Sequence, residues 1–242
     1  MPVRHPRGYI HGFLAVRDAA DSLIGSGDVI QRVAGNRITN SMMLNFRDGS
    51  LYHETAVFSQ RRTYQLLSYK LIQKGPSFKS PGTFTFDRSS GNVVIDYTDE
   101  KQNRKHIFEH MDLPDDLANG LIPTLLTDID PKVETTLSML LSTPKPRLVK
   151  LKISTVEPDS FRVAGVAAQA THYVIKIDIG GVTGVAAKVL GKQPPPEHVW
   201  VAAGNAPIFL RSMGALYEDG PIWQIELTSP NWPERAKART EE

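Results

Sequence analysis

The 242-residue chain is 40% hydrophobic and 22% charged, which is typical of a globular protein and too apolar for general disorder. Its 28 basic and 26 acidic residues leave a formal charge of +2, so a nucleic-acid-binding surface is not indicated. The chain has no cysteine, which excludes disulfides, thiol nucleophiles and cysteine-bound metals, and no apolar run is long enough for a membrane-spanning helix.

The first half of the chain is predicted to be a series of short antiparallel strands joined by tight turns. In 37–46, apolar side chains alternate with polar ones, which is typical of a half-buried strand. Arg47-Asp48-Gly49-Ser50 is a strong turn signal after it. A polar link is expected over 18–27. The strands are expected over 8–16, 28–33, 37–46, 52–58, 64–72, 83–86, 93–97 and 105–111.

The strongest helical pattern in the chain runs over 111–129. Its leucines recur every four residues and form one apolar stripe, while Asp112 suits an N-cap and Pro114 suits a first helical turn. We expect a helix over 114–127. Pro123 removes a helical hydrogen bond, so one kinked helix competes with two short helices meeting at 120–123. A kinked or broken form is favoured, because the leucine spacing continues across the break.

The second half returns to strand patterns. Strands are expected over 133–141, 148–153, 173–179, 198–203, 208–212 and 221–227, whereas 182–190 suits either a short helix or a strand. Residues 231–242 are predicted to form a flexible tail. Together these patterns predict a mainly β protein with a single domain over 1–230. A curved antiparallel sheet or half-open barrel would wrap around the leucine-rich helix.

A short histidine-containing string carries the most specific chemical motif. His106, Glu109 and His110 match the H-x-x-E-H pattern of zinc peptidases, in which two histidines on one helical turn bind the metal. The surrounding pattern predicts a strand, where the two histidines would stand about 13 Å apart at about 3.3 Å per residue. The strand interpretation is therefore favoured, and no catalytic residue, metal or cofactor is predicted.

The apolar stripe and the aromatic C-terminal region suggest a different kind of site. Three tryptophans, Phe209 and Tyr217 fall in the last fifth of the sequence, where they either pack in the core or line the mouth of an apolar cavity. The candidate ligand-binding residues are Leu117, Leu121, Leu125, Trp200, Phe209 and Trp223.

The order of elements resembles a bacterial family of unknown function whose members look like lipoprotein carriers. The resemblance rests on 115–126, on His198-Val199-Trp200-Val201 with Pro207, and on Ile225-Glu226-Leu227, and spans about four fifths of the chain. It implies an incomplete antiparallel barrel around a helix and a location beyond the cytoplasmic membrane, although no signal peptide is visible. It supplies no catalytic residues.

Three functions therefore remain after the sequence analysis. A non-enzymatic binding or carrier protein for an apolar, lipid-like ligand is preferred, because the concave face of a half-open barrel can hold such a molecule. A structural or interaction module with a filled core is the alternative. A zinc-dependent hydrolase using His106, Glu109 and His110 is the least favoured.

Overall fold

The computed structural model describes residues 1–142, 145–163, 166–178, 194–204 and 207–228, and nearly all of its regular structure is β-strand. The predictions for 182–190 and 231–242 lie outside the described residues. The strands are β1 Ile10–Arg17, β2 Leu23–Ala34, β3 Arg37–Phe46, β4 Leu51–Gln60, β5 Tyr64–Lys74, β6 Gly82–Asp87, β7 Asn92–Thr98, β8 Arg104–His110, β9 Thr135–Leu141, β10 Arg147–Thr155, β11 Asp159–Val163, β12 Val166–Asp178, β13 Glu197–Ala202, β14 Phe209–Ala215 and β15 Ile222–Thr228.

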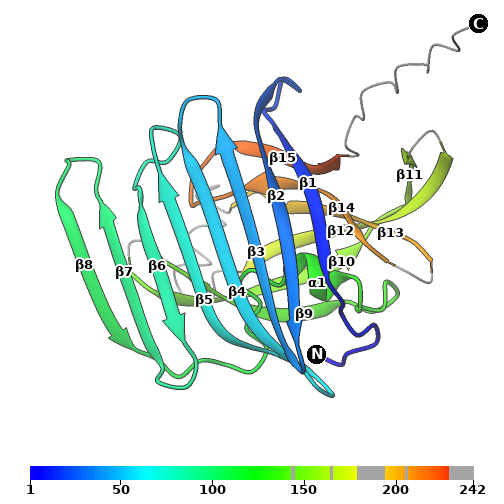
Figure 1. The fold of residues 1–242 in the computed structure, drawn as a ribbon, viewed down its shortest axis with the longest axis horizontal. Coiled ribbons are helices and arrows are strands. Elements are labelled where there is room, and N and C mark those ends of the chain that lie inside the picture. The colour runs from blue at the N-terminus through cyan, green and yellow to red at the C-terminus, as the bar shows by residue number, and fades with distance from the viewer. Residues whose placement is uncertain (143–144, 164–165, 179–193, 205–206, 229–242) are drawn as a thin grey trace, which may run out of the picture.

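All fifteen strands belong to one antiparallel sheet. Its order is β8-β7-β6-β5-β4-β3-β2-β1-β15-β14-β13-β12-β10-β9, with β11 paired to β12 beside this path. Strands β1–β8 make a front layer, and β9, β10 and β12–β15 turn behind it and run across it (Figure 1). The pairing of β1 with β15, which places Leu14 opposite Leu227, joins the two layers. The predicted mainly β, curved antiparallel architecture is confirmed, and the sheet does not close into a barrel.

The core lies between the two layers because the strands alternate apolar and polar residues. On β4, Tyr52, Ala56 and Phe58 are buried and share one face, and Phe58 is 0% exposed. Ile153 on β10 and Ile175 on β12 belong to the same buried cluster from the other side. Full burial of such a side chain contributes roughly 1.5–3 kcal/mol, so this alternation stabilises the stacking of the layers.

Strand β2 begins earlier than predicted, because part of the expected polar link over 18–27 belongs to it. Gly25 and Gly27 pair with Phe46 and Leu44 on β3. A side chain at Gly27 would collide with the Met43 carbonyl oxygen, so only glycine permits this close approach of the two backbones. Composition favoured a loop, and the close approach explains why glycine occurs here in a strand.

The predicted helix over 114–127 is wrong: only α1, Ile122–Leu126, is helical. Upstream, the backbone lies along the edge of β9, where Leu117 forms a parallel bridge with Ser138. The Ser138 N–H donates to the Asp116 carbonyl at 3.1 Å, and the Ala118 N–H donates to the Ser138 carbonyl at 2.8 Å. These bonds to a distant strand replace the helical ones. The leucines are buried as the stripe predicted, but from an irregular segment.

Strand β11 and the first part of β12 were not predicted. Phe161 pairs with Ala168 in this hairpin, whose two arms are rich in small and polar residues. Such residues have weak strand propensity, so pairing with a neighbour rather than local pattern produces the strands. Within the described residues, no helix has the length and apolarity required to cross a membrane.

Candidate functional site

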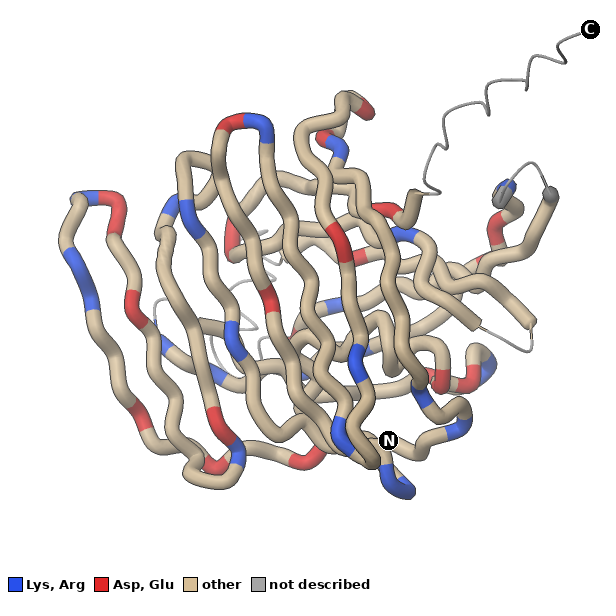
Figure 2. The backbone as a smooth tube through the Cα atoms, in the orientation of Figure 1, with Lys and Arg blue, Asp and Glu red and all other residues tan. Residues whose placement is uncertain are grey.

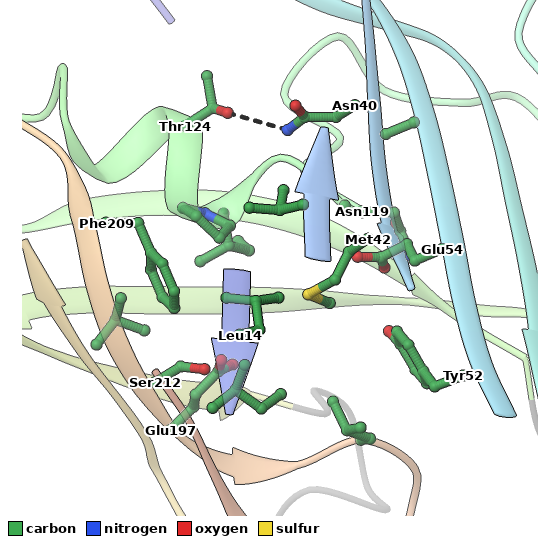
Figure 3. A pocket seen from close by; sticks show the side chains of 18 of the residues that line it. Leu14, Asn40, Met42, Tyr52, Glu54, Asn119, Thr124, Glu197, Phe209 and Ser212 are labelled. Carbon is green, nitrogen blue, oxygen red and sulfur yellow. Dashed lines mark hydrogen bonds between the residues drawn. The ribbon is translucent and has the colours of Figure 1, made fainter. Parts of the chain in front are cut away.

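A cavity of about 1970 Å³ lies between the front and rear layers. Small-molecule sites commonly measure about 300–1,000 Å³, so this one is large enough for a lipid-sized molecule. Its lining includes exposed residues such as Glu218 and Asp219, so the cavity reaches the protein surface. Figure 3 shows side chains from both layers and from the α1 region converging on it: Leu14, Asn40, Met42, Tyr52, Glu54, Asn119, Thr124, Glu197, Phe209 and Ser212.

Strand register determines which side chains point into the cavity. Met42 on β3 stands opposite Glu54 on β4, and both face inward in phase with the buried Tyr52. On the rear layer Glu197 precedes the buried Val199 by two residues, so the two share a face of β13. Acidic side chains from the two layers therefore enter the same apolar space.

Glu54 is held in place by buried tyrosines. The Tyr69 hydroxyl donates to Glu54 Oε1 at 2.6 Å. Burial raises the pKa of Glu54, while hydrogen bonds from Tyr69 and Tyr52 act in the opposite direction. Burial and the charge of Glu54 raise the pKa of both tyrosines, which therefore stay protonated as donors.

Glu197 has no such support. Burial, followed by the charge of Glu54, raises the pKa of its carboxyl from 4.5 to about 7. Among the described residues, neither a hydrogen-bond donor nor a Lys or Arg partner is found for the Glu197 carboxyl. No described cation contributes to the pKa shift of Glu54 either. The side chain is half-buried and faces the cavity (Figure 3). Within the described residues, this carboxyl is therefore left without a compensating partner.

The segment that precedes α1 forms one wall of the cavity. The Asn119 side chain donates to the Leu140 carbonyl and accepts from the Leu140 N–H, both at 2.9 Å. Gly120 has φ of +66°, and a Cβ there would lie 2.8 Å from the Ala56 Cβ. The wall is thus fixed to β9 on one side and packed against β4 on the other. Asn119 was not predicted to be functional.

A buried ion pair holds the chain just after α1. Arg7 Nη2 lies 3.1 Å from Asp128 Oδ2, and the Asp128 side chain is fully buried. The Tyr64 hydroxyl donates to the same oxygen at 2.5 Å, and the His5 N–H donates to Oδ1 at 2.9 Å. This network links the N-terminal residues to the chain just after α1. Arg7 is the cationic side chain in it, and its charge is already paired with Asp128.

The predicted ligand-binding residues occupy three different environments. Phe209 lines the cavity (Figure 3), and Trp200 borders it while its indole N–H donates to Asp159 Oδ2 at 2.6 Å. Trp223 is 5% exposed and packs against Phe46 with ring centroids 4.9 Å apart. Three leucines are buried in the main core and do not line the cavity: Leu117, Leu121 and Leu125.

Sequence reasoning missed the two glutamates as a pair. The signal was available locally, since Glu54 falls in phase with Tyr52 and Ala56, and Glu197 falls in phase with Val199. An acidic residue at an inward position of a strand is unusual, because burying a carboxylate is unfavourable. Their convergence depends on how the sheet folds over.

The histidine-containing string lies on strand β8, as predicted. His106 is exposed, and its Nδ1 lies 2.7 Å from Asp96 Oδ1 on the neighbouring strand. Across the described ranges, no group of three His, Asp or Glu side chains is placed to hold a metal ion. The acidic and basic residues of the front layer are otherwise scattered along the strands without a patch of one sign (Figure 2).

The sequence matches no protein-family model and no curated protein. A solved structure, a beta-barrel-like protein of the domain of unknown function DUF1849 from Brucella abortus, is similar to this chain. The match covers 92% of this chain and 97% of the other at 8% identity, with a TM-score of 0.43.

Proposed function

We propose that the protein binds a lipid-sized, largely apolar small molecule in the cavity between the two layers. The observation that carries this proposal is the cavity of about 1970 Å³, with inward-facing apolar side chains and a few converging polar groups. A carrier role and a location beyond the cytoplasmic membrane are further proposals that rest on the resemblance to lipoprotein carriers.

Native mass spectrometry of the purified protein tests this proposal first. We expect bound mass that organic extraction removes. After extraction, the protein should take up the neutral dye Nile red saturably, with one binding site per chain. Absence of both bound mass and saturable uptake would contradict the proposal and favour an interaction module.

A cavity-filling variant shows whether the dye enters this cavity. Ser212 points into the cavity, so Ser212→Phe should occupy part of the space and reduce dye affinity at least tenfold. The matched control is Ser22→Phe, because Ser22 is exposed and does not line the cavity. Equal dye affinity in the two variants would show that the dye binds elsewhere.

A further inference from the structure

Two carboxyl groups from opposite layers enter the same cavity (Figure 3). Glu54 comes from β4 in the front layer and Glu197 from β13 in the rear layer, and both point into the same space (Figure 3). They are close enough for the charge of Glu54 to act on Glu197. Folding therefore brings together two acidic groups that repel each other when both are ionised.

The surrounding protein provides little compensation for this repulsion. Within the described residues, Glu54 accepts a hydrogen bond from Tyr69, whereas Glu197 has neither a donor nor an ion-pair partner. Removing a carboxylate from water without a partner is costly, and replacing both glutamates with apolar residues would avoid that cost. The arrangement is explained if a bound molecule supplies the missing positive charge.

Resting on the function proposed above, we infer that the ligand is an amphipathic cation whose protonated amine sits between Glu54 and Glu197. An ammonium group has three N–H donors, which suits two carboxylates on opposite walls. Its charge also offsets the repulsion between them. The apolar body of the ligand would lie along Leu14, Met42 and Phe209.

Other headgroups fit this site less well. The carboxylate of a fatty acid would add a third acidic group beside Glu54 and Glu197, and so would bind at the cost of further repulsion or of taking up a proton. A neutral alcohol would gain a hydrogen bond but not the charge interaction. Hydrogen bonds to charged groups contribute more than neutral ones, so headgroup charge should rank the ligands.

Displacement of Nile red from the delipidated full-length protein measures this ranking. The competitors are dodecylamine, dodecanol and dodecanoate at pH 7.5, with the amine and dodecanoate below their critical micelle concentrations and dodecanol below its solubility limit. We expect the amine to bind at least tenfold more tightly than the alcohol, and dodecanoate to bind most weakly. Equal affinities for amine and alcohol would overturn the inference.

Conservative variants locate the effect. Glu197→Gln should reduce the preference for the amine over the alcohol about tenfold, and Glu54→Gln should act in the same direction. Glu157→Gln is the matched control, because Glu157 is exposed and lies away from the cavity lining. A preference that survives both cavity variants would place the ammonium group elsewhere and overturn the inference. Far-UV circular dichroism checks that each variant is folded.

The same experiment separates this inference from the proposed function. If Nile red and dodecanol bind but the amine has no advantage, the cavity binds apolar molecules and only the headgroup assignment fails. If Nile red does not bind saturably and native mass spectrometry finds no bound mass, the proposed function itself fails.

Discussion

Replacing Glu197 with glutamine is expected to remove a pH dependence of folding stability that this carboxyl creates. Its pKa rises from 4.5 to about 7 in the folded protein, so the folded state holds the proton more tightly than the unfolded chain does. The resulting stabilisation is fully present below pH 4.5 and is lost as the pH rises through about 7. In contrast, a carboxyl with a lowered pKa would stabilise the protein at high pH.

The magnitude follows from the pKa shift. Each unit of pKa corresponds to about 1.4 kcal/mol, so a change from 4.5 to about 7 limits the effect to roughly 3 kcal/mol. Solvent entering through the opening of the cavity screens the charge and lowers this value. Between pH 5 and 8, we expect Glu197→Gln to gain roughly 2 kcal/mol of unfolding free energy relative to the natural protein.

Urea denaturation followed by tryptophan fluorescence at pH 5, 6, 7 and 8 measures this difference. Comparing the variant with the natural protein at each pH cancels the contributions of titrating groups away from Glu197, including Asp48 and Asp116, whose pKa values are lowered. The denaturant slope should not change. Glu157→Gln is the control and should show a constant difference. A constant difference for Glu197→Gln as well would refute the assignment of a buried, destabilised carboxylate.

Three further substitutions test the segment that forms the cavity wall, each by its unfolding free energy in urea. Asn119→Ala should destabilise the protein by roughly 2–4 kcal/mol, because the Leu140 N–H and carbonyl lose their partners in the interior. Gly120→Ala should cost roughly 2 kcal/mol or more through its φ of +66° and the collision with β4, and a neutral effect would show that the segment can move. Asp128→Asn should cost roughly 3–5 kcal/mol, since Arg7 would keep a buried charge without its partner; a loss below about 1 kcal/mol would contradict the buried pairing.

The strands of the front layer could be predicted from local sequence because each is encoded by its own alternation and turns. Residues 37–46 show the period of two, and β3 occupies Arg37–Phe46. The string at His106–His110 was likewise placed on a strand by its neighbours, and β8 confirms it. Neighbouring strands are joined by short hairpins, so their order in the sheet follows the order of the chain.

The leucine-rich segment shows where local reasoning failed. A spacing of four residues favours a helix, and the four leucines at that spacing are buried: Leu113, Leu117, Leu121 and Leu125. Only Leu125 lies within α1. Asp116 and Asn119 find hydrogen-bond partners on β9, a strand that follows later in the chain. Backbone groups that hydrogen-bond to a distant strand do not need helical partners. Tertiary contacts therefore override the helix propensity of this segment.

The sequence by itself determined that Glu54 and Glu197 would each point to the apolar side of a strand, because side chains alternate with a period of two. Only the tertiary structure decided that they would face each other. The sheet turns over where β1 pairs with β15, which brings β13 behind β4 and encloses the cavity between them. The local pattern specifies on which face of its strand a side chain lies. Which two strand faces are brought together depends on long-range pairing and on the curvature of the whole sheet.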